Sequence, residues 1–246
     1  MSNKPPRIAM VLAAGLGKRL RPITESTPKP LLKVSGRPLL DYCLDHSKRA
    51  GVERVVINVH YLSDKIRHYI NERKDISIKI SDESNKLLET GGGVQNALSL
   101  VGSLPFYVLN GDVLWLDGPS PALQRLANAW DNDAMDALLL LHSTVEAYGY
   151  SGLGDFLVDP LGRLERRPER MVTPYFFAGV QILHPRLFDN VRKGTFSLNL
   201  LYDKAMEKKR LFGIIHDGDL FHIGTPKGLA QAQNYFEQRF PGNKRR

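Results

Sequence analysis

Two glycines and three cations stand close together near the start of the chain, in the run LAAGLGKRLRP at residues 12–22. Gly15 and Gly17 have no side chain, so the backbone there can pass close to a polyphosphate and turn its N–H groups toward it. Lys18, Arg19 and Arg21 place positive charge where phosphate charge would lie. The spacing therefore predicts a loop that binds a nucleoside triphosphate.

Two common phosphate-binding loops do not fit this run. A Walker loop needs Ser or Thr after its lysine and a further glycine upstream, where this chain has Arg19 and Leu12. A dinucleotide loop needs Gly or Ala at the position of Leu20 and an acidic residue closing the second strand, where residues 58–60 are Asn, Val and His. An ordinary glycine turn after a strand remains possible, but it would not need the three cations.

Lys29 stands between two prolines in TPKPLL, at residues 27–32. Pro28 and Pro30 restrict the backbone on both sides, so the lysine is held in place. On its own such a residue would more often be a solvated lysine in a turn. Its position soon after the basic loop instead favours a fixed cation for the α-phosphate or for a second phosphate.

Asp112 follows FYVLNG, an apolar run of strand length at residues 106–111. Open α/β sheets bind their ligands at the carboxyl ends of strands, and one carboxylate with phosphate oxygens and water is the usual setting for Mg2+. Gly91, Gly92 and Gly93 precede a helical pattern, so their N–H groups are expected to face a base edge or a phosphate. The simpler alternatives are an aspartate in a turn and a helix that merely begins with glycines.

The run LAAGLGKRLRP followed by TPKPLL resembles the signature of the sugar-1-phosphate nucleotidyltransferases. LETGGG at residues 88–93 resembles the segment of that family that binds the base, NGD at 110–112 its metal aspartate, and FHIGTP at 221–226 its C-terminal motif. The resemblance runs through nearly the whole chain and is greatest to the N-acetylmuramate-1-phosphate uridylyltransferases of cell-wall (peptidoglycan) recycling, then to the mannose-1-phosphate guanylyltransferases. It implies a transferase that couples a sugar 1-phosphate to a nucleoside triphosphate and releases pyrophosphate.

The resemblance also implies roles for individual residues. Arg19, Lys29 and Asp112 are expected to be catalytic. The nucleotide-binding residues are expected to be Leu12, Ala13, Ala14, Gly15, Gly17, Lys18, Arg19, Lys29, Glu89, Gly91, Gly92 and Asn110. Gly154 and Glu165 are expected to bind the sugar phosphate, although the usual acid–lysine–proline segment is missing near Glu165. Asp112 and His222 are expected to hold the Mg2+ cofactor.

His222 departs from the pattern, because the family usually has a metal-binding aspartate at this place. Neutral imidazole is a poor ligand for Mg2+, which prefers oxygen. Three explanations stay open: Asp112 holds the ion together with substrate phosphates, Asp217 or Asp219 replaces the missing aspartate, or a softer ion is accepted. A packing or hydrogen-bonding role for His222 fits the residue type at least as well as metal ligation does.

Strands and helices must position these residues, and the periodicity of apolar residues in the sequence predicts where those elements lie. Strand patterns are predicted at residues 7–13, 54–60, 76–81, 106–110, 137–142, 156–158, 175–183, 211–216 and 220–223. Helical patterns are predicted at residues 38–50, 62–73, 93–100, 198–208 and 226–238. The alternation predicts an α/β fold, a Rossmann-like three-layer sandwich with a mixed, mostly parallel central sheet and antiparallel additions in the second half. No linker is visible, so residues 1–246 are expected to form a single nucleotidyltransferase domain.

Net charge and cysteine content indicate which classes of partner and site to expect. The chain carries a formal net charge of +8 at pH 7, but its basic residues are scattered and often neighbour acids, as Lys65 does Asp64. The charge therefore favours attraction to small anionic substrates, a nucleoside triphosphate and a sugar 1-phosphate, over binding of nucleic acid. The basic run at residues 244–246 is interpreted as a solvated tail. Cys43 is the single cysteine, which excludes an internal disulfide and indicates a buried core thiol.

The chain has no apolar run near the roughly 18 residues that a membrane helix needs, and its first ten residues lack the regions of a signal peptide. We therefore expect no membrane partner, a cytoplasmic location and a monomer or homodimer. Two other functions stay open: a cytidylyltransferase-type enzyme that acts on a non-sugar phosphate, and a non-catalytic sensor of nucleotide sugars.

Overall fold

Strand β1 (Ile8–Leu12) lies inside a nine-stranded sheet, because the side chains on both of its faces are apolar. In the computed structural model, which describes residues 4–240, β1 pairs in parallel with β4 (Arg54–Val59) and with β6 (Phe106–Asn110). The basic run at residues 244–246 lies outside the described residues. The main path of the sheet runs β10 (Leu164–Arg166), β9 (Phe156–Val158), β11 (Tyr175–Leu183), β6, β1, β4 and β5 (Ser77–Asp82).

The second half of the chain adds antiparallel strands, as predicted. β11 runs antiparallel to β6 and to β8 (Ala137–Ser143), and β8 pairs in parallel with β12 (Leu211–Ile215). The register between β11 and β8 shifts between Phe177 and Gln181, which is a bulge that bends the strand next to the end of β6. The mixed, mostly parallel sheet flanked by helices confirms the predicted fold class.

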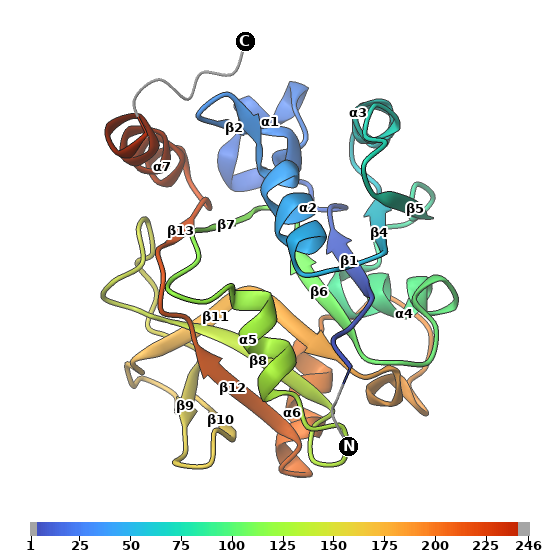
Figure 1. Cartoon of the computed structure of the whole chain (residues 1–246), viewed down its shortest axis with the longest axis vertical. Helices are drawn as coiled ribbons and strands as arrows, with labels where there is room; N and C mark the ends of the chain where they lie inside the picture. The colour runs from blue at the N-terminus through green and yellow to red at the C-terminus, as the bar shows by residue number, and fades with distance from the viewer. Residues whose placement is uncertain (1–3, 241–246) are drawn as a thin grey trace.

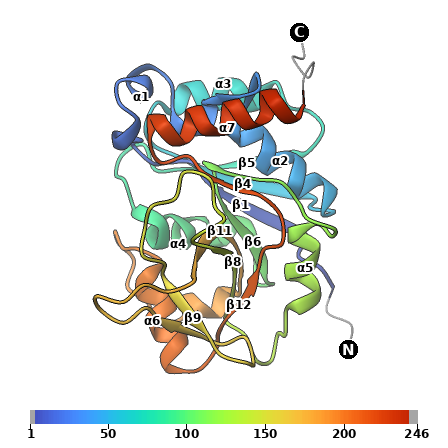
Figure 2. The ribbon, with the colours of Figure 1, turned by 90° about the vertical axis from the view of Figure 1, so that its left-hand side faces the viewer.

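Alternate residues of β1 point to opposite faces of the sheet and enter two different cores. Val11 packs in one core with residues of α2 (Leu39–Arg49), α3 (Ser63–Asn71) and α5 (Ala122–Ala129). Met10 packs in the other with residues of α4 (Glu89–Val101) and α6 (Asn199–Glu207). Figure 2 shows α4 and α6 on one side of the sheet and α2 and α5 on the other.

A two-stranded ribbon crosses above the main sheet. β7 (Val113–Trp115) pairs antiparallel with β13 (Leu220–His222), and Val113 lies opposite His222. A third core packs under α7 (Pro226–Arg239) and joins this ribbon to the hairpin of β2 (Lys33–Val34) and β3 (Arg37–Pro38) (Figure 1). The ribbon brings residue 222 beside residue 113, which are far apart in the sequence.

Some boundaries and some elements differ from the sequence prediction. α4 begins at Glu89 and not at residue 93, so all three glycines of LETGGG lie inside the helix. β7, α5 and β10 were not predicted, and neither were the short elements α1 (Ile23–Ser26), β2 and β3. The predicted core thiol is correct: Cys43 is fully buried, and burial raises its pKa above the ordinary value.

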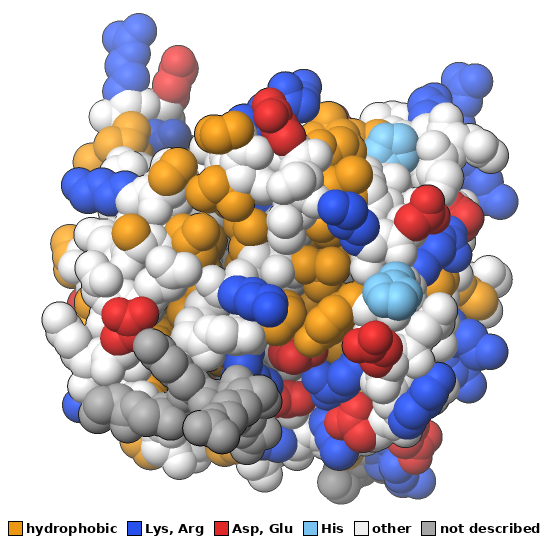
Figure 3. All heavy atoms as spheres, turned by 90° about the horizontal axis from the view of Figure 1, so that it is seen from above, with side chains coloured by type: hydrophobic (Ala, Val, Ile, Leu, Met, Phe, Trp, Pro, Cys, Tyr) orange, Lys and Arg blue, Asp and Glu red, His pale blue; other side chains and the backbone are white. Residues whose placement is uncertain are grey.

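Charged side chains of both signs are mixed on one face of the molecule. Lys and Arg side chains are spread among Asp and Glu on the face seen from above and do not form one basic patch there (Figure 3). Among residues 4–240, no helix is long and apolar enough to cross a lipid bilayer.

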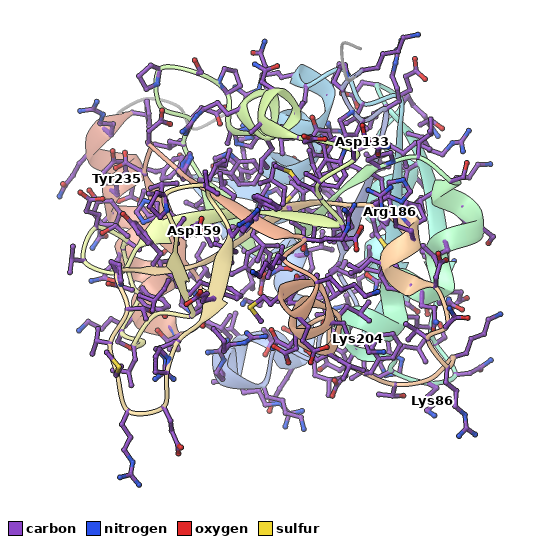
Figure 4. The ribbon with its side chains drawn as sticks, turned by 90° about the horizontal axis from the view of Figure 1, so that it is seen from below. Lys86, Asp133, Asp159, Arg186, Lys204 and Tyr235 are labelled. Atoms are coloured by element: carbon purple, nitrogen blue, oxygen red, sulfur yellow. The ribbon has the colours of Figure 1, made fainter. Side chains whose placement is uncertain are left out.

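A buried carboxylate joins the segments before β8 and β12 to the short helix η3 (Pro185–Phe188). Asp136 Oδ1 accepts hydrogen bonds from Arg186 Nε at 2.6 Å and from Arg210 Nε at 2.9 Å. Arg210 also donates to the carbonyl of Asp133 at 2.7 Å; Figure 4 labels Arg186 and Asp133 in this region. Burial alone would raise the pKa of Asp136, but the two guanidinium groups hold it below its ordinary value.

We expect Asp136→Asn to lower the free energy of unfolding by about 2 kcal/mol at pH 7. The wild-type advantage is fully present above about pH 5 and shrinks as the pH falls below about 4, because the folded state lowers the carboxyl pKa. Urea unfolding of both proteins from pH 7 to pH 3.5 measures this, with Asp133→Asn, whose side chain is exposed, as the control. An equal loss at every pH would contradict the role assigned to the charge.

Candidate active site

The basic glycine loop is anchored to the protein by Thr24 and Leu20, while its cations face solvent. Gly17 has φ 62°, and a Cβ there would lie 2.9 Å from Cγ2 of Thr24. The Thr24 hydroxyl donates to the Gly17 carbonyl at 2.9 Å, and buried Leu20 anchors the short helix η1 (Lys18–Leu20) that follows. Lys18 and Arg19 are exposed. Only glycine fits at position 17, and the loop presents two cations at the end of β1.

Lys29 and Asp112 meet at the carboxyl ends of the central strands. Pro28 and Pro30 are buried on either side of Lys29, which begins η2 (Lys29–Leu31). The ammonium Nζ forms an ion pair with Oδ2 of Asp112. Gly111 positions the aspartate: its N–H donates to the Leu12 carbonyl at 2.8 Å, and a Cβ would lie 2.8 Å from that oxygen. The prolines and this close approach of β6 to β1 fix both charged groups.

Three adjoining cavities surround Asp112. The loop cavity, of about 350 Å3, is lined by the glycine loop, Lys29 and Asp112. The strand-end cavity, of about 360 Å3, is lined by the ends of β1, β4 and β6, by Glu89 and by Asp112. The inner cavity, of about 160 Å3, lies between Arg19, Lys29, Asp112 and the bulged part of β11. Asp112 lies where the three cavities meet, and Lys29 and Arg19 lie between the loop and inner cavities.

His222 lines the inner cavity together with Asp112, Lys29 and Arg19. Its backbone N–H donates to the Tyr148 carbonyl at 2.8 Å, which fixes this end of β13. Burial, and then the nearby charges of Lys29 and Arg19, lower the pKa of His222 below its ordinary value. Both causes favour the neutral form of the imidazole.

Asp217 and Asp219 do not take the place of the missing aspartate. They lie at the other end of the ribbon, where Asp219 Oδ2 accepts from the Tyr235 hydroxyl at 2.5 Å and Asp217 pairs with Arg125 at 2.7 Å. The Leu116 N–H donates to the Asp219 carbonyl, so Asp219 lies about four residues, or roughly 13 Å, along β7 from Asp112. This explanation, left open by the sequence, is excluded.

The donor set of the site fits a magnesium ion only in part. Within residues 4–240, no group of three or more His, Cys, Asp and Glu side chains could hold a metal ion by itself. One carboxylate, Asp112, faces the three cavities with a neutral imidazole nearby. That is enough for an ion whose remaining ligands are phosphate oxygens and water, as is usual for Mg2+, so the site suits a metal that arrives with its nucleotide.

The first two glycines of LETGGG do not have the free N–H groups that the sequence predicts. The N–H groups of Gly91 and Gly92 both donate to the Phe196 carbonyl, at 2.9 and 3.1 Å. Side chains there would collide with neighbours, since a Cβ on Gly91 would lie 2.4 Å from the Phe196 ring and one on Gly92 2.2 Å from the Gly194 carbonyl. The expectation that these amides are free for a base edge is therefore wrong in this structure, where the glycines serve packing; a nucleotide-binding role of Gly91 and Gly92 through other contacts stays a prediction. Glu89, at the start of the same helix, does line the strand-end cavity.

The two residues assigned to the sugar phosphate lie outside the residues that line the three cavities. Glu165 is exposed on β10, and Gly154 is buried with its N–H donating to the Tyr150 hydroxyl at 3.1 Å. Gly149, which was not predicted, packs closer to the site: it has φ 76°, and a Cβ would lie 2.9 Å from the His222 carbonyl. The roles of Gly154 and Glu165 stay predictions.

Most of the other expected residues do come together. The loop and strand-end cavities are lined by Leu12, Ala13, Ala14, Gly15, Gly17, Lys18, Arg19, Lys29, Glu89 and Asn110, among others. Sequence reasoning missed Asn58, which lies near the end of β4 and lines the strand-end cavity. A polar residue near the end of the apolar run RVVINV was the signal that could have found it.

Comparisons with known proteins agree with this geometry. Residues 8–239 match the family described as Nucleotidyl transferase. The chain is 37% identical to the N-acetylmuramate alpha-1-phosphate uridylyltransferase of Caulobacter vibrioides, over 94% of this chain and 97% of that one. It is 36% identical to the protein of the same name from Neisseria meningitidis serogroup B, over 92% and 96% of the two chains. The catalytic subunit beta of the mannose-1-phosphate guanylyltransferase of Drosophila melanogaster is 28% identical, over 89% of this chain and 60% of that one.

Solved structures share the fold. A UDP-glucose pyrophosphorylase complexed with UDP-glucose superposes with a TM-score of 0.79 at 18% identity and covers 95% of this chain and 99% of its own. The inositol-1-phosphate CTP transferase from T. maritima gives a TM-score of 0.75 at 20% identity, over 96% and 98% of the two chains.

Proposed function

Because the chain belongs to the nucleotidyl transferase family, we propose that it couples N-acetylmuramate 1-phosphate to UTP and releases pyrophosphate. The family is catalytic and acts on nucleoside triphosphates and sugar phosphates. The observation that carries the proposal is the position of Asp112 where three cavities meet, beside two cations from separate segments, Lys29 and Arg19.

Each substrate has a cavity of suitable chemistry. The loop cavity, with Lys18 and Arg19, takes the β- and γ-phosphates, since its cations and bare glycine backbone suit a polyphosphate. The strand-end cavity takes the nucleoside. The inner cavity takes the sugar phosphate, so that the α-phosphate of the nucleotide lies near Lys29 and Asp112.

The reaction is an in-line displacement at the α-phosphorus. An oxygen of the sugar 1-phosphate attacks, the bond to the β-phosphate breaks, and pyrophosphate leaves with the electron pair. Both substrates are anions, so catalysis consists of positioning and charge neutralisation. Lys29 holds the α-phosphate and the attacking phosphate together, and Arg19 stabilises the charge that gathers on pyrophosphate. No protein nucleophile takes part.

The family generally uses a divalent metal ion, and we propose that it is Mg2+ here. Asp112 would hold the ion together with phosphate oxygens and water, while His222 borders the site as a neutral group. When bound, the ion supplies further neutralisation of the phosphate charge. Lys29 must then leave its ion pair with Asp112 and turn to the α-phosphate.

The choice of N-acetylmuramate and UTP rests on the two relatives at 37% and 36% identity, both of which carry that activity in their names. By the same reasoning the enzyme serves cell-wall recycling and works in the cytoplasm, where nucleoside triphosphates are available. A single domain and a monomer or homodimer remain part of this proposal.

The test is a matrix of reactions with Mg2+. The protein is incubated with each of the common nucleoside triphosphates and with N-acetylmuramate, N-acetylglucosamine, mannose and glucose 1-phosphates, plus phosphocholine as a non-sugar acceptor. We expect pyrophosphate release and a product with the mass of UDP-N-acetylmuramate, abolished by EDTA and restored by excess Mg2+. A product formed only with phosphocholine would identify the cytidylyltransferase-type alternative, and tight binding without any product would identify a sensor.

A further inference from the structure

A buried chain of hydrogen bonds connects the two segments between which the nucleotide would lie. The Ala13 N–H, in the glycine loop, donates to Asn58 Oδ1 at 2.7 Å. Asn58 Nδ2 donates to Glu83 Oε1 at 2.7 Å, and the other carboxylate oxygen of Glu83 accepts from the Leu88 N–H at 3.3 Å. Leu88 immediately precedes Glu89, the first residue of α4. The hydrogen bonds therefore connect the glycine loop to the turn before α4, on the other side of the strand-end cavity.

The side chains of Asn58 and Glu83, in the middle of this series of hydrogen bonds, are buried and closely packed. Asn58 is 2% exposed and Glu83 is 3% exposed. Gly93 lies directly against both, because a Cβ there would be 2.8 Å from Glu83 Oε1 and 2.9 Å from Asn58 Nδ2. The backbone of Glu83 is also fixed, since its N–H donates to the Val59 carbonyl at 2.9 Å. The third glycine of LETGGG therefore makes room for this pair.

Glu83 is a buried carboxylate with no Lys or Arg ion pair among residues 4–240, and burying such a group is costly. Burial raises the pKa of Glu83, and the hydrogen bonds from Asn58 and Leu88 oppose that shift. An apolar pair at these positions would pack without this cost but would leave the Ala13 N–H unsatisfied and uncoupled from Leu88.

We propose that Asn58 and Glu83 are positioning residues, which lock the glycine loop and the turn before α4 at the spacing that a bound nucleoside triphosphate requires. This inference rests on the proposed function and names two residues whose action is indirect. Both oxygens of Glu83 and both polar atoms of Asn58 are already engaged within the protein, so neither depends on a contact with substrate.

The chain of donors and acceptors allows a reciprocal test. Asn58→Asp alone places an acceptor against Glu83 Oε1, and Glu83→Gln alone leaves a donor facing either Asn58 Nδ2 or the Leu88 N–H. The double variant Asn58→Asp/Glu83→Gln restores all three hydrogen bonds with the middle one reversed. In it the new carboxylate at position 58 accepts from the Ala13 N–H and from the new amide at position 83, and the oxygen of that amide accepts from the Leu88 N–H.

The readouts are KM for UTP and kcat by pyrophosphate release, KM for the sugar 1-phosphate, and binding of UTP alone by calorimetry. They are made at a temperature at which circular dichroism shows every variant folded. We expect each single variant to raise KM and Kd for UTP roughly ten- to hundredfold, the range for one buried polar group left without a partner, with a much smaller effect on KM for the sugar phosphate. The double variant should return both UTP constants to within roughly threefold of wild type. Asn96→Asp, on α4 but bonded only to Ser81 at 3.0 Å, is the matched control.

The outcomes separate the possible roles. Single variants that lower the melting temperature but leave UTP binding unchanged would reduce the pair to a purely structural role and overturn the inference. A double variant as weak as the singles would also overturn it, because a direct contact of Asn58 with substrate would not be rescued by the reversed pair. Wild-type protein that binds no triphosphate would overturn the proposed function together with this inference, whereas normal wild-type turnover with unaffected variants overturns the inference alone.

Discussion

Lys29→Met is expected to lower kcat/KM by roughly 10²- to 10³-fold, with most of the loss in kcat. The backbone of Lys29 is fixed between two buried prolines, and its side chain lines both the loop and inner cavities. A cation whose backbone is held at the site loses less conformational freedom on reaching the phosphates than one on a mobile loop does, so more of its interaction stabilises the transition state. Methionine keeps the length and apolar contacts of the side chain, so the fold should persist. Steady-state pyrophosphate release measures the effect.

The same variant should bind metal more tightly in the absence of nucleotide. In the free protein Lys29 forms an ion pair with Asp112, so a metal ion must compete with the ammonium for the carboxylate. Binding of Mn2+ as a paramagnetic probe, followed by electron paramagnetic resonance, should therefore be stronger in Lys29→Met than in wild type. Lys33→Met, at an exposed position of β2 in the same segment, is the control. Near-normal turnover in Lys29→Met would contradict the assignment of this residue.

The sequence predicts the sheet well because its strands and helices carry their own signals. β6 and β11 have the predicted bounds, and most other predicted elements differ by one or two residues at an end. Apolar runs of β-branched residues and 3.6-residue periodicity are local properties. The placement of Asp112 follows from them, since a strand that ends in NGD must deliver its carboxylate to the carboxyl edge of the sheet.

What the sequence does not predict depends on contacts between distant segments. Three successive glycines weaken a helix, so α4 was expected to begin after them. They are helical because the segment around Phe196, more than a hundred positions later, packs where their side chains would be. In the same way β7, which was not predicted, is defined by its pairing with the distant strand β13. The N–H groups of Gly91 and Gly92, which were expected to be free, donate to the carbonyl of this segment at Phe196.

The open question about a second acidic ligand has the same origin. Sequence distance alone made Asp217 and Asp219 reasonable substitutes, since both precede His222 closely. The register of β13 against β7 decides against them, because it sets His222 beside Val113 and Asp219 opposite Leu116. A residue's place along an antiparallel ribbon, and not its distance in sequence, determines which side chains reach Asp112.

Asp112→Asn is expected to lower kcat/KM by roughly 10³-fold, because a metal that neutralises phosphate charge contributes several kcal/mol to the transition state. The amide keeps the shape of the carboxylate but cannot supply its charge. Binding of Mn2+ in the presence of UTP, measured by electron paramagnetic resonance, should fall in parallel. Asp219→Asn, at the other end of the ribbon and bonded to Tyr235, should leave both measurements close to wild type. An equal loss of activity and Mn2+ binding in Asp219→Asn and Asp112→Asn would support Asp219 as the second metal-binding aspartate. If Lys29 and Asp112 act on the same phosphates, as we propose, the double variant Lys29→Met/Asp112→Asn should lose less activity than the product of the two single losses.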